Sequence, residues 1–338
     1  MTYDTLLKAE RRLGHGAVAR WLTAHTAGRG AEFLAMTGEH AERAGETALA
    51  INCFEQAGDE AHNRFANAAA ASWLRRALAL LDGSQPRRCF DLLDKLDRIA
   101  DTVGDRPGQD RLMAEMAALL ERHPDDARQA ELLFRQALLA DRRSDASAAE
   151  RLSRQAFELA ERCGAVQWAA MAQGRLAWLH LARQDYPGAT RHLEIGLPWA
   201  GKIQPDSRRA GTEAQLLTLS GMVSRLNCQL DEARVTLTAV LARGETLGKP
   251  RVQLGALDNL AYPASALGQW DEWASWGARY RALAHAIGSR LDVARGQLHL
   301  ALAAQALGDP ATAIRWHEQS LVIFRATGDR RMAAVALR

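Results

Sequence analysis

Apolar residues along the chain recur at the three- and four-residue spacing of amphipathic helices, and turn residues interrupt them at regular intervals. No segment shows the alternation of apolar and polar residues that is typical of a β-strand. The turns follow one another about every twenty residues, which predicts helices of roughly 15–18 residues. They fall at Gly104, Ser144, Gly164, Gln184, Cys228, Gly248, Gly268, Gly288, Gly308 and Gly328. The pattern predicts antiparallel helix pairs stacked as an all-α solenoid.

The helix pairs repeat with a period of forty residues in the C-terminal half of the chain. Gly248, Gly288 and Gly328 are forty positions apart, and an insertion of four residues falls in the segment AGKIQPDSRRAG. Glycine suits the left-handed residue that closes a helix. Asp185 and Asp309, each followed closely by proline, are typical of residues that open the next helix.

Small residues recur on the same period and indicate where the two helices of a pair cross. Small side chains on both helices let the backbones approach closely, and here they lie twelve residues apart. The pairs are Ala137/Ala149, Ala177/Ala189, Gly221/Ala233 and Ala301/Ala313. Larger apolar residues are expected to pack each second helix on the following pair, at Phe157, Leu197, Leu241 and Leu321.

Three stretches resemble the tetratricopeptide repeat: LAMTGEHAERAGETALAINCFEQAG, LSGMVSRLNCQLDEARVTLTAVL and LALAAQALGDPATAIRWHEQSL. In the first, Gly38, Gly45, Ala50, Phe54 and Ala57 stand at the spacing of that family. The resemblance covers residues 31–338 and implies a right-handed α-solenoid of about seven to eight helix pairs, with the last one truncated. The period of forty resembles the longer repeats of bacterial signal-transduction ATPases, some of them linked to cyclases, and of maltose-type transcriptional activators.

Residues 1–30 have a separate resemblance, to the helical linker that joins an ATPase or winged-helix region to the repeats of multidomain signalling ATPases. It rests on an aromatic residue, two leucines, an arginine run and a Val-Ala-x-Trp-Leu helix, at Tyr3, Leu6, Leu7, Arg11, Arg12, His15, Val18, Ala19, Trp21 and Leu22. The last stretch, TGDRRMAAVALR, begins a new first helix. We therefore expect the sequence to be a piece of a larger regulator.

Charge and composition exclude several classes of partner. Of the 338 residues, 48% are hydrophobic and 25% charged, and 43 Lys and Arg against 40 Asp and Glu leave a net charge of +3. A net charge this small gives a weak electrostatic field, and the chain has no basic arm, so nucleic-acid binding is not favoured. No stretch is apolar enough for a membrane span. The four cysteines form no C-x-x-C pair, which favours a reducing cytoplasm over a disulfide framework or a zinc site.

Motifs for catalysis are missing from the sequence, so we predict that the chain is not an enzyme and needs no cofactor or metal. GLPWAGKI, residues 196–203, has the glycine and lysine spacing of a phosphate loop but lacks the final Ser or Thr that would hold magnesium. The ten histidines include no H-E-x-x-H pair, and no G-x-S-x-G elbow occurs. The possibility that a full-length parent protein has ATPase or cyclase activity stays open.

Three tryptophans, Trp270, Trp273 and Trp276, lie in the stretch GQWDEWASWGARY. Trp273 occupies the position that is alanine in other repeats, and the same repeat carries Pro263, which is expected to kink its first helix. The favoured interpretation is packing between helices, with the indole N–H groups bonded to carbonyls that the proline frees. An irregular repeat acting as a hinge or partner contact, or a ligand cage of indoles, are the alternatives.

A partner is expected on the side of the array that its first helices line. Equivalent positions along those helices form a ladder of apolar residues, Leu138, Trp178, Met222, Tyr262 and Leu302, with Arg225, Asp258 and Arg295 beside it. Aromatic residues and methionine next to arginines suit a peptide or helix with an acidic edge. The alternative is that these residues only fill the space between successive helices.

These observations favour a protein-interaction scaffold of a bacterial signalling or transcription regulator that binds a peptide or protein, including other domains of its parent. The resemblance to sugar-responsive activators keeps a second possibility open, a module that senses a small-molecule inducer. An enclosed pocket around Trp178 and Tyr262 would favour the small molecule, and an open channel would favour a polypeptide.

Overall fold

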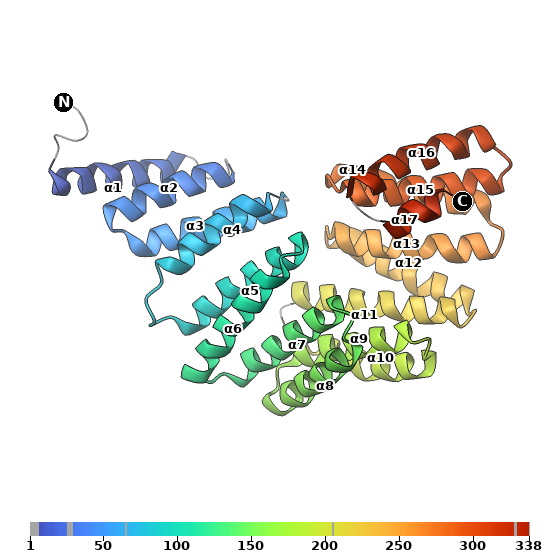
Figure 1. Ribbon diagram of the computed structural model, residues 1–338, viewed down its shortest axis with the longest axis horizontal. Coiled ribbons are helices and arrows are strands. Elements are labelled where there is room, and N and C mark those ends of the chain that lie inside the picture. Colours follow the sequence, from blue (N-terminus) through green and yellow to red (C-terminus); the bar gives the residue numbers. More distant parts are fainter. Residues whose placement is uncertain (1–6, 26–29, 65, 205, 328–329, 338) are drawn as a thin grey trace. The chain divides into compact units, whose positions relative to one another are not determined.

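The computed structural model describes residues 7–25, 30–64, 66–204, 206–327 and 330–337, and within them the chain forms seventeen helices and no β-strand (Figure 1). The all-α prediction is confirmed. The helices are α1 (Lys8–His25), α2 (Ala31–Ala44), α3 (Thr47–Asn63), α4 (Asn67–Ala79), α5 (Pro86–Val103), α6 (Arg106–Arg122), α7 (Asp126–Arg142), α8 (Ala146–Cys163), α9 (Val166–Ala182), α10 (Tyr186–Gly201), α11 (Asp206–Leu226), α12 (Leu230–Thr246), α13 (Pro250–Ala266), α14 (Trp270–Ala286), α15 (Arg290–Ala306), α16 (Pro310–Thr327) and α17 (Arg330–Ala336).

The helices end at the turn residues that the sequence singled out. All the predicted turn glycines within the described residues, from Gly104 to Gly308, have a left-handed backbone with φ between 58° and 78°. The three turn residues that are not glycine, Ser144, Gln184 and Cys228, adopt the same conformation, with φ of 60–62°. Gly328 lies outside the described residues. The repeat therefore fixes the backbone conformation of these turns even where the side chain disfavours it.

Aspartates open several of the helices, as predicted for two of them. The Asp185 carboxylate accepts a hydrogen bond from the Gly188 N–H at 2.9 Å, and Asp309 accepts one from the Thr312 N–H at 3.0 Å. Asp105 and Asp125 cap α6 and α7 in the same way. Each carboxylate satisfies an N–H group that would otherwise have no partner in the first turn.

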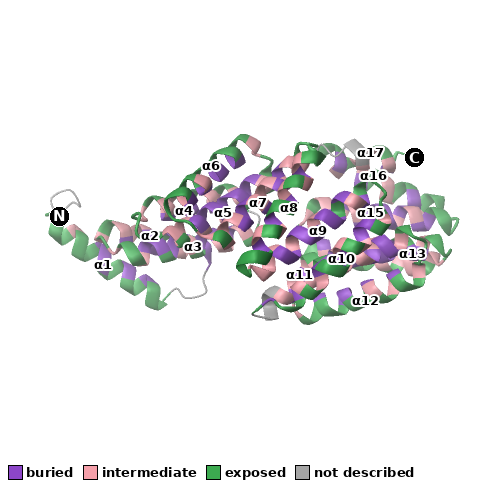
Figure 2. Ribbon diagram, turned by 90° about the horizontal axis from the view of Figure 1, so that it is seen from below, coloured by how far each residue is buried: buried purple, intermediate pink, exposed green. Residues whose placement is uncertain are grey.

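Small residues lie buried at the helix crossings. Ala149, Ala189 and Ala233 are fully buried and Ala313 is 4% exposed, so the predicted crossing positions face the interior. At Gly221 an added Cβ would come within 2.7 Å of Leu237 on the neighbouring α12, which shows how closely α11 and α12 approach. Figure 2 shows the result along the array, where buried and exposed residues alternate around each helix.

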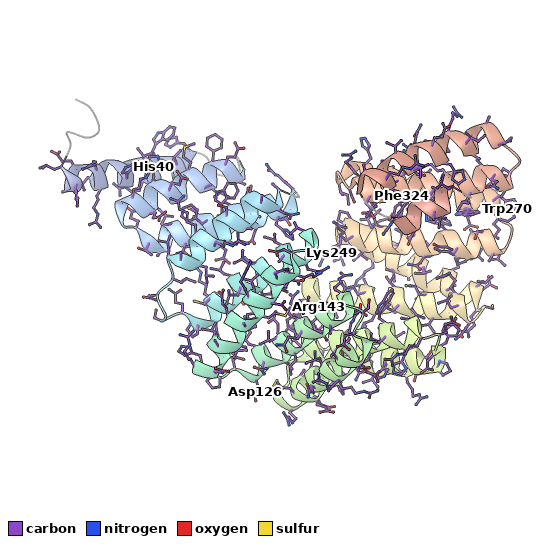
Figure 3. All side chains as sticks on the ribbon, viewed as in Figure 1. His40, Asp126, Arg143, Lys249, Trp270 and Phe324 are labelled. Atoms are coloured by element: carbon purple, nitrogen blue, oxygen red, sulfur yellow. The ribbon has the colours of Figure 1, made fainter. Side chains whose placement is uncertain are left out.

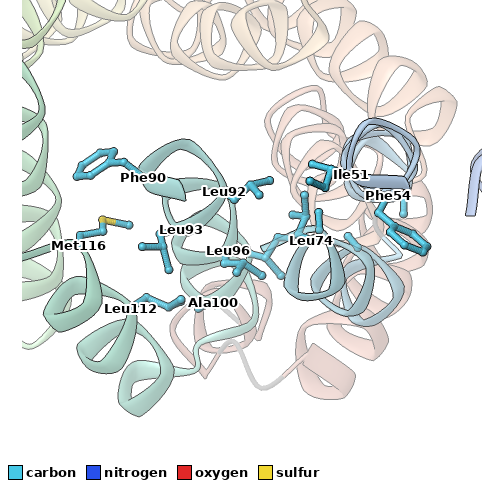
Figure 4. Packing of buried hydrophobic residues seen from close by; sticks show 14 of the residues in the cluster. Ile51, Phe54, Leu74, Phe90, Leu92, Leu93, Leu96, Ala100, Leu112 and Met116 are labelled. Carbon is cyan, nitrogen blue, oxygen red and sulfur yellow. The ribbon is translucent and has the colours of Figure 1, made fainter. Parts of the chain in front are cut away.

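The chain divides into two compact units, residues 1–145 and 146–338, and each has its own core. In the N-terminal unit the core runs from α1 through α7 and includes Ile51, Phe54, Leu74 and Phe90 (Figure 4). The Phe54 ring packs against Gly38, where an added Cβ would lie 2.9 Å from it. The glycine and phenylalanine of the sequence signature are thus direct packing partners.

Ion pairs join α5 to α7 in the N-terminal unit, with partners 37 or 41 residues apart along the chain. The pairs are Asp91–Arg128, Asp94–Arg135 and Asp101–Arg142. Glu131 is buried beside them, and its carboxylate accepts a hydrogen bond from Arg128 at 2.7 Å. Burial and the nearby Asp94 raise the pKa of Glu131 to about 7, against an ordinary value of 4.5. Charged side chains therefore join these two helices, one repeat apart.

In the C-terminal unit the first helices α9, α11 and α13 form a packed layer, because α11 contacts both α9 and α13. Buried residues of α9, α10 and α11 make one apolar cluster, those of α11 to α14 a second, and those of α15 to α17 a third. First helices that contact each other along an array line its inner side. The predicted ladder positions of this unit lie on these first helices.

The regular alternation of first and second helices does not run unbroken through the chain. The signature around Gly38 and Phe54 makes α2 a first helix and α3 a second one, whereas the forty-residue period makes α9 a first helix. The five helices between them are an odd number, so one helix is additional. None of the described helices combines the length and the apolar character needed to cross a membrane.

Two glycines bring α14 and α15 together in the C-terminal unit. An added Cβ at Gly296 would lie 2.7–2.8 Å from the Cβ, Cα and backbone N of Arg281, and one at Gly277 would lie 2.9 Å from the Cβ of His299. Backbone atoms therefore meet across this crossing. The alanine pairs in the sequence did not predict this crossing, because they mark contacts within a helix pair and α14 and α15 belong to successive pairs.

Candidate functional site

The candidate site lies on α9, α11, α13 and α15 of the C-terminal unit, and we call it the inner-helix face. It is made of the predicted residues Trp178, Met222, Arg225, Asp258, Tyr262, Arg295 and Leu302, together with His299. Trp178 is 38% exposed and Tyr262 44% exposed, which is unusual for large aromatic side chains in a helical array. Neither ring is enclosed, so this face is open to solvent.

Arg225 and Tyr262 form the centre of the face. The guanidinium carbon of Arg225, on α11, lies 4.5 Å from the centroid of the Tyr262 ring, on α13. An arginine over an aromatic ring is attracted by the ring's negative face, and it holds the ring in one orientation. Tyr262 is thus 44% exposed to solvent while a side chain of a neighbouring helix packs on its ring.

His299, on α15, packs against the Tyr262 ring. Its ring meets the Tyr262 ring edge-on, with centroids 5.9 Å apart, and its Nε2 lies 2.9 Å from the Asp258 carboxylate. The Trp273 indole N–H donates to Nδ1 of His299 at 3.2 Å. Because the indole can only donate, Nδ1 must accept and Nε2 must carry the proton that goes to Asp258. The two hydrogen bonds of His299 thus link α13, α14 and α15.

A second set of polar contacts lies next to His299. The Tyr280 hydroxyl, on α14, donates to Asp292 at 3.0 Å, and Arg295 lies 3.6 Å from the same carboxylate. Burial, followed by the neighbouring Asp292 charge, raises the pKa of Tyr280, so its hydroxyl stays a donor. Asp292 therefore holds Arg295, which lies on the same helix as the ladder residue Leu302.

The remaining ladder residues are not joined to this centre by a described contact. Met222 is half-buried against the cluster that contains Ala177 and Leu181, and Leu302 is half-buried in the C-terminal cluster with Phe324. These two residues contribute to packing. Leu138 lies on α7, in the N-terminal unit, and is half-buried. The inner-helix face is therefore described for the C-terminal unit alone.

The three tryptophans of α14 are half-buried, which agrees with a packing role, but their N–H groups bond differently from the expectation. Trp273 donates to His299, and Trp276 donates to Glu272 at 3.3 Å. The expected carbonyl partners were wrong for these two residues, because side-chain acceptors on α15 and on α14 itself take their N–H groups, and Pro263 lies inside α13, which runs from Pro250 to Ala266. The Trp270 and Trp273 rings lie 6.1 Å apart at a tilt of 45°. Figure 3 shows Trp270 at the start of its helix.

A pocket of about 330 Å³ lies in the N-terminal unit, away from the predicted residues. Its wall is formed by the start of α5, the end of α6 and the start of α7, with Phe90 and Leu120 among apolar residues and Arg87, Arg122 and Arg128 among charged ones. Neither Trp178 nor Tyr262 lines it. Among the described residues, no group of three or more His, Cys, Asp and Glu side chains is arranged to hold a metal ion.

A histidine pair lies between α9 and α10. His180 pairs with Asp185 at 2.7 Å, His192 pairs with the Gln173 side chain at 2.7 Å, and the two rings are 4.9 Å apart. Burial, followed by the proximity of His180 and Arg154, lowers the pKa of His192 from 6.5 to about 4. His192 therefore remains neutral in the folded protein at a pH where it is charged in the unfolded chain.

The free energy of unfolding is expected to fall as the pH drops from 6.5 towards 4, because the unfolded state then takes up a proton at His192 that the folded state refuses. Part of the side chain is in solvent, so we expect a loss of about 1–2 kcal/mol. Urea unfolding at several pH values would measure it. His192→Gln should lose less stability over the same range, and parallel curves for both proteins would contradict the assignment.

His299 is the residue of the candidate site that the sequence analysis missed. A lone histidine in a helix gives no motif, and its partners Asp258 and Trp273 lie on two other helices. One signal was present: Asp258 and His299 are 41 residues apart, close to the repeat period. Two of the three ion pairs between α5 and α7 have the same separation, so charged residues about one period apart are a usable signal in this chain.

No protein-family model and no curated protein matches the sequence. Solved structures match its fold. A Rap protein complexed with competence and sporulation factor matches with a TM-score of 0.61 and 13% identity, over 98% of this chain and 95% of that one. Aspartyl phosphate phosphatase F from Bacillus subtilis matches with a TM-score of 0.54 and 12% identity, over 100% and 93% of the two chains.

A third match is a signal-transduction ATPase with numerous domains and a tetratricopeptide repeat sensor, from Pyrococcus horikoshii. Its TM-score is 0.57 at 13% identity, and the alignment covers 97% of this chain but 51% of that one, so this chain spans about half its length. At such identities the matches establish the fold. The chain is a solenoid of the tetratricopeptide-repeat type, as the sequence resemblance predicted.

Proposed function

We propose that this chain is a non-catalytic interaction scaffold of a bacterial signalling or transcription regulator, which binds a peptide or protein segment on its inner-helix face. The single observation that carries the proposal is the Arg225–Tyr262 pair. It offers a large exposed aromatic surface and a positive charge, and the His299–Asp258 contact holds it in place. Rigid aromatic and arginine side chains supply most of the binding energy at protein interfaces.

The charge of this face suits a partner with acidic residues. Arg225 lies over the Tyr262 ring, and Arg295 supplies a second positive charge on α15. The open position of Trp178 and Tyr262 supports a polypeptide over a small inducer, which would need an enclosed pocket. The fold shared with a Rap protein in complex with a signalling factor, and with the sensor of a signalling ATPase, supports a role in regulation. Four free cysteines support a cytoplasmic site of action.

The test is a selection of random peptides displayed on phage against the immobilised full chain, followed by fluorescence anisotropy of the enriched peptides. We expect sequences with acidic residues beside apolar ones. Arg225→Gln and Tyr262→Ala should each weaken binding at least about tenfold, the effect of losing one interface hot spot. Circular dichroism of each variant would verify that it remains folded.

Arg281 and Trp316 provide a matched control. Their cation–π contact, at 5.0 Å, also joins two helices one repeat apart, but these are the second helices α14 and α16. Arg281→Gln and Trp316→Ala should leave peptide binding unchanged. Equal losses in both pairs of variants, or no loss at Arg225 and Tyr262, would contradict the proposal. Enrichment of no peptide at all would favour the small-molecule sensor instead.

A further inference from the structure

The first helix, α1, exposes an apolar side that none of the described helices covers. Leu7, Leu13 and Trp21 are 71%, 73% and 58% exposed, and Val18 is 39% exposed. These four large apolar residues lie in or directly before one helix, whereas α16, the next richest helix, exposes only Ile314 and Val322. Exposed apolar residues gathered on one helix mark an interaction surface more often than scattered ones do.

The exposed and buried residues occupy opposite sides of α1. His15, Ala19 and Leu22 are buried and face α2. An α-helix turns by about 100° per residue, so five residues of α1 fall within an arc of about 140° on the other side. They are Leu13, Gly14, Ala17, Val18 and Trp21. That side holds small residues, Gly14 and Ala17, between the large ones. The same arrangement of small and large residues packs helices against each other elsewhere in the chain.

The order of these residues makes the side complementary to a second copy of itself. Leu13 and Trp21 are equally far from Ala17, one helical turn on each side. If two copies of α1 lie antiparallel with Ala17 on the twofold axis, Leu13 of each copy meets Trp21 of its partner, and Ala17 meets Ala17. Glu10 of one copy then reaches the last turn of the other, near His25. Antiparallel helix dipoles also attract.

The positive charges of α1 favour this partner over a membrane surface. An interfacial membrane helix keeps its basic residues beside its apolar face. Here Arg12 turns back and donates to the Ala44 carbonyl at 3.2 Å, and Arg20 pairs with Glu46 at 3.1 Å. Two of the four cations of α1, Arg12 and Arg20, are thus engaged by the segment that ends α2 and opens α3.

We propose that the exposed side of α1 is a homodimer interface, in which α1 pairs antiparallel with α1 of a second copy across a twofold axis at Ala17. One helix per copy buries less surface than a standard stable interface, so the dimer is weak and depends on protein concentration. The proposal does not depend on the inner-helix face, which lies on other helices in the C-terminal unit.

Sedimentation velocity of the full chain over a roughly hundredfold range of concentration tests it. We expect the average mass to rise towards twice the monomer mass. Leu13→Glu and Trp21→Glu should raise the dissociation constant at least tenfold, because each places two charges in the apolar contact. Val235→Glu is the matched control, since Val235 is 71% exposed on α12, and it should associate like the original chain.

Cross-linking tests the twofold axis separately. In a background of Cys163→Ser and Cys228→Ser, which removes the two exposed thiols, Ala17→Cys should give a disulfide-linked dimer under mild oxidation. Val235→Cys in the same background should not. Both results would support a twofold axis at Ala17, and equal cross-linking at both positions would overturn the proposal.

Three other outcomes would also overturn the proposal. The chain could stay monomeric at every concentration. That result would indicate that another domain covers this side of α1, as the resemblance of residues 1–30 to a domain junction implies. The Trp21→Glu variant could associate as strongly as the original chain, which would place the interface elsewhere. The original chain could stay monomeric and sediment with vesicles of anionic lipid, which would make α1 a membrane-surface helix.

Discussion

Phe54→Ala is expected to lower the free energy of unfolding by about 3–5 kcal/mol, the range for removing a large buried aromatic side chain. Phe54 is fully buried between α2, α3 and α4, in the cluster with Ile51 and Leu74. Its ring fills the space that Gly38 leaves open. Urea unfolding followed by circular dichroism would measure the change. Met36→Ala is the control, because Met36 on α2 is 44% exposed and should cost less than about 1 kcal/mol.

A second substitution tests whether Gly38 and Phe54 act as a pair. Gly38→Ala alone places a methyl group 2.9 Å from the ring and should destabilise the protein. In the Phe54→Ala background the same methyl enters the cavity, and alanine is the better helix former by about 1 kcal/mol. The sign of the effect should therefore reverse. Effects that simply add would mean that the two residues do not contact each other.

Gly296→Val is expected to destabilise the protein by roughly 3 kcal/mol, at the upper end for overpacking a tight contact. The added Cβ would meet backbone atoms of Arg281 at 2.8 Å, and these cannot move unless α14 moves as a whole. Displacing α14 from α15 would also stretch the Trp273–His299 and Tyr280–Asp292 hydrogen bonds. Binding at the inner-helix face should weaken together with stability.

Gly255→Val is the matched control for Gly296→Val. Gly255 also lies inside a first helix, α13, but the nearest atom to an added Cβ is Thr218 Cγ2 at 3.9 Å. The control should cost well below 1 kcal/mol, because valine and glycine differ little in helix propensity. Thermal unfolding and peptide binding of both variants would show whether substitution at Gly296 costs more than substitution at Gly255. Similar losses at both glycines would mean that the α14–α15 crossing is not tight.

The repeat made most of the fold predictable from the sequence. Turns, helix lengths and buried alanines all follow from one spacing, and even Ser144, Gln184 and Cys228 could be assigned to turns because the spacing placed them there. Trp273 shows the limit of this approach. The period identified it as an exception, but the sequence could not show that its indole would bond to a histidine on the next helix.

The candidate site was predictable in part for the same reason. Equivalent positions on successive first helices singled out Arg225 and Tyr262 as neighbours of one ladder, but the contact between the two side chains is seen only in the structure. The ladder did not distinguish exposed residues from packed ones, and Met222 and Leu302 proved to be half-buried. Which side of a helix its neighbours cover depends on close contacts between helices, such as the one at Gly296, and the spacing of residues in the sequence does not show these contacts.

The close succession of the helices has a consequence for how the chain folds. Within each unit, the main helix contacts join elements that are adjacent or next but one along the chain. Short loops close at a small entropic cost, so such contacts form quickly and in any order. The cooperativity of unfolding then depends on the strength of each junction between neighbours. A weakened junction would allow the protein to melt in stages, with one stretch of helices losing its structure while the other keeps it.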